Sequence, residues 1–136
     1  MSIKSFLICN SDGLPFYSKK IDPNFEDYDP HLFSGWISAI SIIGKKLFHE
    51  EIATLSFGIN KEASIVILPR EFFGFDKVIF FVFLIENEID HKKLRQLCTN
   101  ILIEAKGYLK TVPLQSDERF KIKIDKVVDS MKDSFL

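Results

Sequence analysis

The segment 78–85, VIFFVFLI, constrains the fold of this chain more than any other, because all eight of its residues are apolar. A run of this length is far too short to span a bilayer as a helix, which takes roughly 20 apolar residues. A strand that is apolar on both faces has to be covered on both sides, so the run predicts a central strand between two layers of helices. Residues 64–68, SIVIL, predict a second strand of this kind. Residues 52–59 alternate in polarity, which predicts a half-exposed strand.

The composition favours one folded domain over residues 1–136. The chain has 46% hydrophobic residues, including 14 Phe, and only five Pro and six Gly, so it has apolar surface for a core and no linker-like segment. Its net charge of −1 gives no positive field that would collect nucleic acid or anionic lipid. No segment is apolar over the length of a membrane span or a signal peptide. We therefore expect a cytoplasmic protein that associates with membranes only through its partners.

The two cysteines indicate neither a disulfide nor a metal site. Cys9 and Cys98 lie far apart in the chain, within apolar segments, and no His or Cys stands near either at metal-ligand spacing. Reduced thiols in the core are therefore expected.

The sequence SDGLP lies between two strand-like segments, 5–9 (SFLIC) and 16–20 (FYSKK). Gly13 supplies the positive φ that a tight hairpin turn requires. A phosphate-binding loop would need more glycines and a following helix, and a calcium loop would need oxygen ligands where Leu14 and Phe16 stand. The pair Asp12-Gly13 therefore predicts a turn and not a ligand site.

The first predicted helix begins with Asp29 as N-cap and Pro30 as its first residue, and it runs to about Phe48. Apolar side chains recur in it at 3.6-residue spacing, and this stripe is expected to pack on the core. The stripe consists of Leu32, Phe33, Trp36, Ala39, Ile40, Ile43 and Leu47.

Two further helices are predicted after the last strand. Asp90 caps the first, which runs to about Leu109, and the second starts at about Asp117. The segment FKIKI in the second also fits a strand, but the helical pattern explains more of its residues. The expected core residues are Leu94, Leu97, Cys98, Ile101, Ala105 and Tyr108 in the first helix, and Phe120, Ile124, Val127, Val128, Met131 and Phe135 in the second. The sequence leaves open whether the last helix packs on this domain or on a partner.

The predicted element order, β-β-α-β-β-β-α-α, gives one antiparallel sheet with one helix on one face and two on the other, an α/β sandwich. This order, with the hairpin NSDGLPFYS leading to a long helix and three strands, resembles the longin domain and its relative, the roadblock (LC7-like) domain. Roadblock-type sequences commonly carry a Ser-Asp-Gly-Leu-Pro-like turn in this hairpin. They usually have a helix before it, whereas this chain starts with the strand and ends with two helices, as longin domains do. The resemblance implies a five-stranded sheet in the order 2-1-5-4-3, with the third strand at an edge.

The resemblance also implies a function. Proteins with these folds are typically not enzymes; they dimerise with their own kind and serve as platforms or regulators for Ras-like small GTPases, often in membrane traffic. The expected partners are thus a second copy or a related longin or roadblock domain, and a small GTPase. In several such proteins the first helix and the edge of the third strand form the contact, which corresponds to residues 30–48 and 52–59 here.

The predicted interface follows from these two elements. The side of the first helix opposite to the expected core stripe carries short side chains, where a solvated face normally carries long charged ones. Residues 52–59 include neither Pro nor Lys, so the strand edge has no obvious protection. The predicted interface residues are Ser34, Ile37, Ser38, Ser41, Ile42 and Lys45 on the helix and Thr54, Ser56 and Gly58 on the strand. The alternatives are an ordinary polar helix face and an edge that the chain itself covers.

A secondary interface candidate lies in the segment PREFFGFDK, where aromatic residues stand beside an arginine, a combination common in interfaces. It comprises Arg70, Phe72, Phe73 and Phe75. The alternative is that these phenylalanines fold back over the end of the core.

No catalytic, cofactor-binding or metal-ligating residues are predicted. His49-Glu50-Glu51 lacks the second His of a zinc protease helix, since Ala53 stands at that position, and the glycine-lysine pair at 44–45 lacks the other residues of a phosphate loop. The alternative function is a small-molecule sensing domain. Bulky side chains along 65–68 and 80–84 leave little room for such a ligand.

Overall fold

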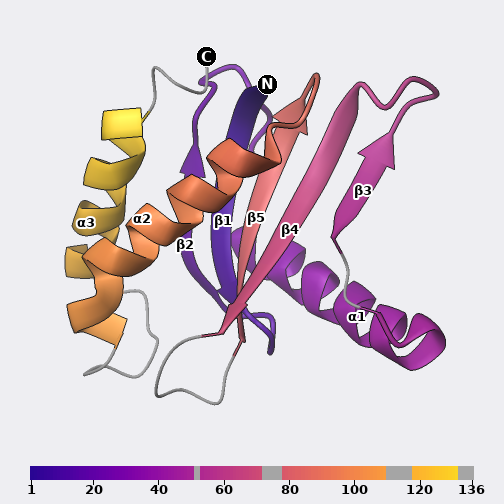
Figure 1. Ribbon diagram of the computed structural model, residues 1–136, viewed down its shortest axis with the longest axis horizontal. Helices are drawn as coiled ribbons and strands as arrows, with labels where there is room; N and C mark the ends of the chain where they lie inside the picture. The colour runs from indigo at the N-terminus through magenta and orange to yellow at the C-terminus, as the bar shows by residue number, and fades with distance from the viewer. Residues whose placement is uncertain (51–52, 72–77, 110–117, 132–136) are drawn as a thin grey trace.

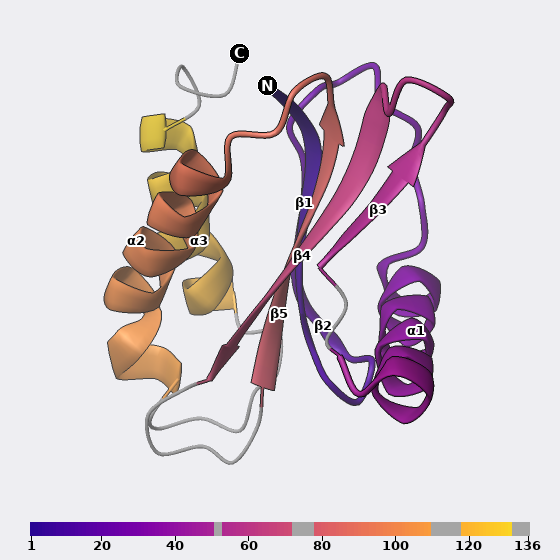
Figure 2. The same cartoon turned by 45° about the vertical axis from the view of Figure 1, so that its right-hand side comes forward.

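The computed structural model describes residues 1–50, 53–71, 78–109 and 118–131, and these form an α/β sandwich (Figure 1). The elements are β1 (Ser2–Asn10), β2 (Pro15–Lys20), α1 (Pro30–Phe48), β3 (Thr54–Phe57), β4 (Ala63–Glu71), β5 (Val78–Glu86), α2 (His91–Leu109) and α3 (Glu118–Met131). All strand pairs are antiparallel, and the sheet order is β2-β1-β5-β4-β3. Helix α1 covers one face of the sheet, and α2 and α3 cover the other (Figure 2). The predicted fold class, element order and sheet order are confirmed.

The apolar strand β5 lies at the centre of the sheet, between β1 and β4, as its sequence predicts. Phe81 and Phe83 point to the side of α2 and α3, whereas Phe80 and Val82 belong to the core cluster on the α1 side. Phe6 of β1 stacks on Phe83 with ring centroids 4.9 Å apart. Because successive side chains of β5 point to opposite faces of the sheet, this strand contributes to both cores. Its sequence is therefore apolar throughout.

The hairpin turn between β1 and β2 is organised by Asn10. Its Oδ1 accepts hydrogen bonds from the backbone N–H groups of Asp12 and Leu14, at 3.0 and 2.9 Å. Gly13 has a φ of +87° and donates its N–H to the carbonyl of Asn10 at 3.1 Å. The segment is therefore a turn, as predicted, and Asn10 stabilises it through contacts that the sequence pattern does not indicate.

The C-terminal helices pack on the sheet as their amphipathic patterns predict. Asp90 caps α2, because its Oδ1 accepts the N–H of Lys93 at 3.2 Å. The FKIKI segment is helical and belongs to α3. The buried residues are Leu94, Leu97, Cys98 and Ile101 in α2 and Phe120, Ile124, Val127 and Val128 in α3, and Met131 is partly buried. The remaining predicted core side chains, Ala105, Tyr108 and Phe135, lie outside the described side chains.

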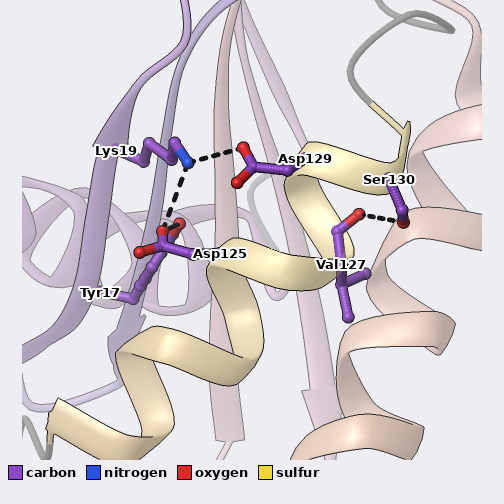
Figure 3. A network of polar contacts seen from close by, with 6 residues as sticks. All are labelled: Tyr17, Lys19, Asp125, Val127, Asp129 and Ser130. Atoms are coloured by element: carbon purple, nitrogen blue, oxygen red, sulfur yellow. Dashed lines mark hydrogen bonds and ion pairs between the residues drawn. The ribbon is translucent and has the colours of Figure 1, made fainter.

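Polar contacts hold α3 against β2 (Figure 3). The buried Tyr17 donates its hydroxyl to Asp125 Oδ1 at 2.5 Å. Lys19 Nζ lies 3.4 Å from Asp125 Oδ1 and 2.9 Å from Asp129 Oδ1. The last helix therefore packs on its own domain through both an apolar and a polar contact, which answers the question that the sequence left open.

We expect the Tyr17 hydroxyl to make folding stability fall at alkaline pH. Burial first, and then the hydrogen bond to Asp125, raise the pKa of Tyr17 above its ordinary value of 10.0. The unfolded chain therefore loses this proton at a lower pH than the folded one, so the stability is intact below about pH 10 and declines above it. Tyr17→Phe should cost about 1 kcal/mol at neutral pH and remove this part of the decline. Urea unfolding between pH 7 and 11 measures the stability loss at neutral pH and the decline at alkaline pH, with Tyr28→Phe as control. An alkaline decline in Tyr17→Phe as large as in the unmodified protein would contradict this role of Tyr17.

Candidate protein interface

Helix α1 has the opposite orientation to the one expected from its sequence. The side chains that face the sheet are Ser34, Ile37, Ser38 and Ser41, which are 0, 0, 8 and 7% exposed. The predicted core stripe points away from the sheet: Leu32, Trp36, Ile43 and Leu47 are 75, 41, 53 and 67% exposed, and Ala39 is exposed as well. Only Phe33 and Ile40 of that stripe are partly buried. The prediction of which face packs on the core is therefore wrong.

The reason is the close approach of α1 to the β1–β2 turn. A Cβ placed on Gly13 would lie 3.1 Å from the Cα of Gly35 and 3.4 Å from the Cβ of Ser38. Ser38 Oγ also donates a hydrogen bond to the carbonyl of Ser11 at 2.7 Å. Larger side chains on this face would push the helix away from the turn, so small residues are required where backbones come this close. The short side chains do allow another backbone to approach, but that backbone is the chain's own hairpin.

This orientation changes the predicted interface. Ser34, Ile37, Ser38 and Ser41 are buried inside the domain and offer no surface to a partner, which corrects the prediction for these four residues. Ile42 and Lys45 are exposed. We define the apolar stripe as the outward residues Leu32, Trp36, Ala39, Ile43 and Leu47. The periodicity of the sequence located this stripe, but it did not show which way the stripe faces.

Exposed apolar side chains concentrate on α1 and β3. Among the described residues, eleven large hydrophobic side chains are exposed, and eight of them lie on α1, on β3 or in the turn after β3. Besides those of α1, they include Phe57, 51% exposed, and Ile59, fully exposed. Scattered apolar residues are normal on a protein surface, but this concentration on two consecutive elements of the chain favours a binding surface.

The edge of β3 is open, whereas the opposite edge of the sheet is protected. The outer strand β2 begins with Pro15 and ends in Lys19 and Lys20, residues that discourage pairing with another strand. β3 contains neither residue type. Ile67 donates its N–H to the carbonyl of Ala53 at 2.8 Å, and the alternation of an antiparallel ladder then directs the N–H and C=O of Thr54 and Ser56 to the open side. We name these outward backbone groups the β3 edge.

The strand β3 is shorter than predicted, and its outward residues are exposed. It covers Thr54–Phe57, while the expectation was 52–59, of which Ile52 lies outside the described residues. Thr54, Ser56 and Gly58, the predicted interface residues of this strand, are all exposed.

A shallow apolar groove of about 240 Å³ lies beside β3. Its walls include Phe25 from the loop before α1, Phe57 of β3, and Ile65 and Leu84 of the two neighbouring strands. At its polar end Lys4 forms ion pairs with Asp22 at 3.0 Å and with Glu86 at 3.5 Å. The groove therefore offers room for an apolar side chain next to the β3 edge. The groove was not predicted from the sequence, because the loop residue Phe25 reaches it only in the folded chain.

The secondary interface candidate is only partly described. Arg70 lies in β4 and is partly buried, and Phe72, Phe73 and Phe75 lie outside the described residues.

The described residues supply neither a metal site nor a reactive thiol. They contain no group of three or more His, Cys, Asp or Glu side chains that would hold a metal ion. Burial raises the pKa of the Cys9 thiol to about 11 and that of Cys98 to about 12, so both thiols stay protonated and unreactive at neutral pH. No helix in this part of the chain has the length and apolar character that crossing a membrane requires.

In comparisons with known proteins, no protein-family model matches the sequence, and no curated protein matches it.

Proposed function

We propose that this protein is a non-enzymatic interaction module that dimerises and serves as a platform or regulator for a Ras-like small GTPase, with membrane traffic as a setting. The observation that carries the proposal is the apolar stripe of α1, whose side chains are exposed although the helix belongs to a well-packed domain. Exposure of such a surface to water is unfavourable, and its burial against a protein partner lowers the free energy.

The fold supports the same proposal. The element order and the sheet order β2-β1-β5-β4-β3 are those that the resemblance to longin domains implies. The first helix and the third strand, which form contacts in several proteins of this kind, are the elements on which exposed apolar residues concentrate. The GTPase as partner comes from the resemblance, and the surface itself comes from the burial pattern.

The β3 edge suits a partner that adds a strand to the sheet. In this mode of binding, main-chain hydrogen bonds supply affinity, and pockets for alternate side chains supply specificity. The outward groups of Thr54 and Ser56 are the main-chain partners here, and the groove between Phe25 and Phe57 is the side-chain pocket. An extended segment of the GTPase is therefore proposed to pair with the β3 edge as an added strand.

Capture of purified small GTPases tests the proposal. Ras-like GTPases from the same cell, each loaded with GDP or with a GTP analogue, are passed over the immobilised protein. We expect retention of at least one GTPase, with a preference for one nucleotide state. Ser56→Pro should weaken this retention about tenfold or more, because it removes an outward N–H and blocks the edge.

The matched control is Ser56→Ala, which keeps the backbone N–H and should retain the GTPase at the level of the unmodified protein. Circular dichroism of both variants checks that the sheet is intact, and Thr54→Pro serves as a second edge variant. Failure to retain any GTPase in either nucleotide state would contradict the GTPase part of the proposal. Equal retention by the proline and alanine variants would contradict the role of the β3 edge.

The alternative of a small-molecule sensor finds less support in the structure. The spaces between the sheet and its helices are filled by the two core clusters. The groove beside β3 is open and smaller than a usual ligand pocket of about 300–1,000 Å³. A second hollow of about 480 Å³ lies beside the turns that follow β3 and β5 and is lined by polar residues such as Glu62 and Asn87; it has the volume of a ligand pocket but is open to solvent.

A further inference from the structure

The sheet-facing side of α1 changes from buried to exposed toward the end of the helix. Ile37, Ser41 and Phe48 follow one another at spacings of four and seven, so they lie on one side of the helix. Ile37 and Ser41 are 0 and 7% exposed, whereas Phe48 is 72% exposed. The N–H of the C-cap residue His49 donates to the carbonyl of Lys45 at 3.1 Å, so the chain is helical up to Phe48. A large apolar side chain therefore stands uncovered on the side of α1 that packs on the sheet elsewhere.

The last turn of α1 lies beyond the outer strand of the sheet. Figure 1 shows the C-terminal end of α1 extending past β3. Among the described elements no strand lies opposite Phe48, because β3 is the last strand on this side of the sheet. A strand added at the β3 edge would continue the sheet beneath this turn and cover Phe48.

The side of β3 that faces α1 is apolar. Leu55 packs against the core cluster on the α1 side, and Phe57, two residues further on, points to the same side and is half exposed. Phe57 lines the apolar groove together with Phe25 and Ile65. Side chains of an added strand that point to this side would therefore meet apolar surface at the groove and at Phe48.

The opposite side of β3 is polar and acidic. Ser56 precedes Phe57 in the strand, so its side chain points to the other face of the sheet, where it lines the polar hollow of about 480 Å³. The walls of this hollow carry the carboxylates of Glu62 and Glu88 and the ammonium group of Lys61. None of these three charges forms an ion pair with another described residue. Two carboxylates against one ammonium group leave a net negative charge, which favours a cationic side chain on this side.

We propose that the segment that pairs with the β3 edge is a strand of alternating apolar and basic residues. Its apolar side chains contact Phe48 and Phe57 on the α1 side, and its basic side chains lie toward Glu62 and Glu88 on the other. Residues 53–60 contain no basic residue, so the β3 strand of a second copy does not have this pattern. The proposal rests on the proposed function, which places an added strand of a GTPase at this edge. It adds the chemistry of that strand and a contact with the last turn of α1.

Binding of short fluorescent peptides tests this proposal without a GTPase. The first peptide alternates Val and Lys over about six residues, the length of an ordinary strand. The second has the same composition with Val and Lys in two separate blocks, and the third has Glu in place of Lys. Fluorescence anisotropy should show binding of the first peptide, and of the other two about tenfold more weakly or less. No binding of the first peptide, or equal binding of all three, would overturn the proposal.

Two neighbouring residues at the end of α1 provide matched variants. Leu47 and Phe48 are 67 and 72% exposed, but Leu47 belongs to the apolar stripe and points away from the sheet. Phe48→Ala should weaken binding of the first peptide about tenfold, because it removes a large apolar contact. Leu47→Ala should leave this binding unchanged, and circular dichroism of both variants checks that the helix is intact. Equal affinities of the two variants would contradict the contact between the added strand and α1.

This proposal and the proposed function can fail separately. Binding of the alternating peptide without retention of any GTPase would support the chemistry of the edge and contradict the GTPase as partner. Retention of a GTPase that Ser56→Pro weakens and Phe48→Ala does not would support the GTPase and overturn the contact with α1. A doubled solution mass that Ser56→Pro abolishes would place a second copy at the β3 edge, and it would overturn the basic segment as occupant.

Discussion

Ser38→Arg is expected to prevent α1 from packing on the sheet, whereas Ala39→Arg, one residue further on, is expected to leave the domain folded. Ser38 is 8% exposed and lies against the β1–β2 turn, with its hydroxyl bonded to the carbonyl of Ser11. An arginine there overpacks the contact, at a cost of about 1–3 kcal/mol, and buries a charge at a cost of several more. The sum is comparable with the total stability of a typical domain, about 5–15 kcal/mol.

The folding stabilities of these two variants distinguish the two possible orientations of α1. Chemical denaturation and circular dichroism should show a loss of several kcal/mol, or a largely unfolded chain, for Ser38→Arg and a cooperative native-like transition for Ala39→Arg. The orientation expected from the sequence predicts the opposite ranking, because Ala39 would then face the core. A folded Ser38→Arg together with an unfolded Ala39→Arg would therefore contradict the packing described here.

Two glycines that face each other across the same contact should respond to alanine with opposite signs. Gly13→Ala is expected to destabilise the domain by about 2–4 kcal/mol, because Gly13 has a φ of +87° and a new Cβ would lie 3.1 Å from the Cα of Gly35. Gly35→Ala should stabilise it by about 0.5–1 kcal/mol, since this exposed helical position has no atom within 4 Å of a new Cβ.

Urea unfolding of the two alanine variants measures both effects. They share the same chemical change, so differences in the unfolded state largely cancel in the comparison. Equal effects of the two substitutions would mean that the turn and the helix do not make the close contact on which the orientation of α1 depends.

The local pattern of the sequence was sufficient for most of the fold. The apolar run of β5 required cover on both faces, and the Asp12-Gly13 pair required a turn. The face of α3 was predicted correctly for the same kind of reason. Its buried side chains, such as Phe120 and Ile124, oppose a face rich in charged residues, so only one orientation buries apolar surface without burying charge.

For α1 the same reasoning failed, because neither of its two faces carries charge along most of its length. One face has the five apolar residues of the stripe, and the other has three serines around Ile37. Burying the stripe would bury more apolar area, but the large side chains would hold the helix away from Gly13. The contact between Gly13 and Gly35 joins residues 22 positions apart, and helical periodicity contains no information about it.

The amino-acid sequence by itself determined the elements, their order and the existence of an apolar stripe on α1, since these follow from local periodicity and turn chemistry. Only the tertiary structure decided that the stripe faces outward and that the predicted serine surface is internal. The physical reason is the geometry of one close backbone contact, in which small residues bring α1 onto the hairpin turn and leave the large apolar residues exposed.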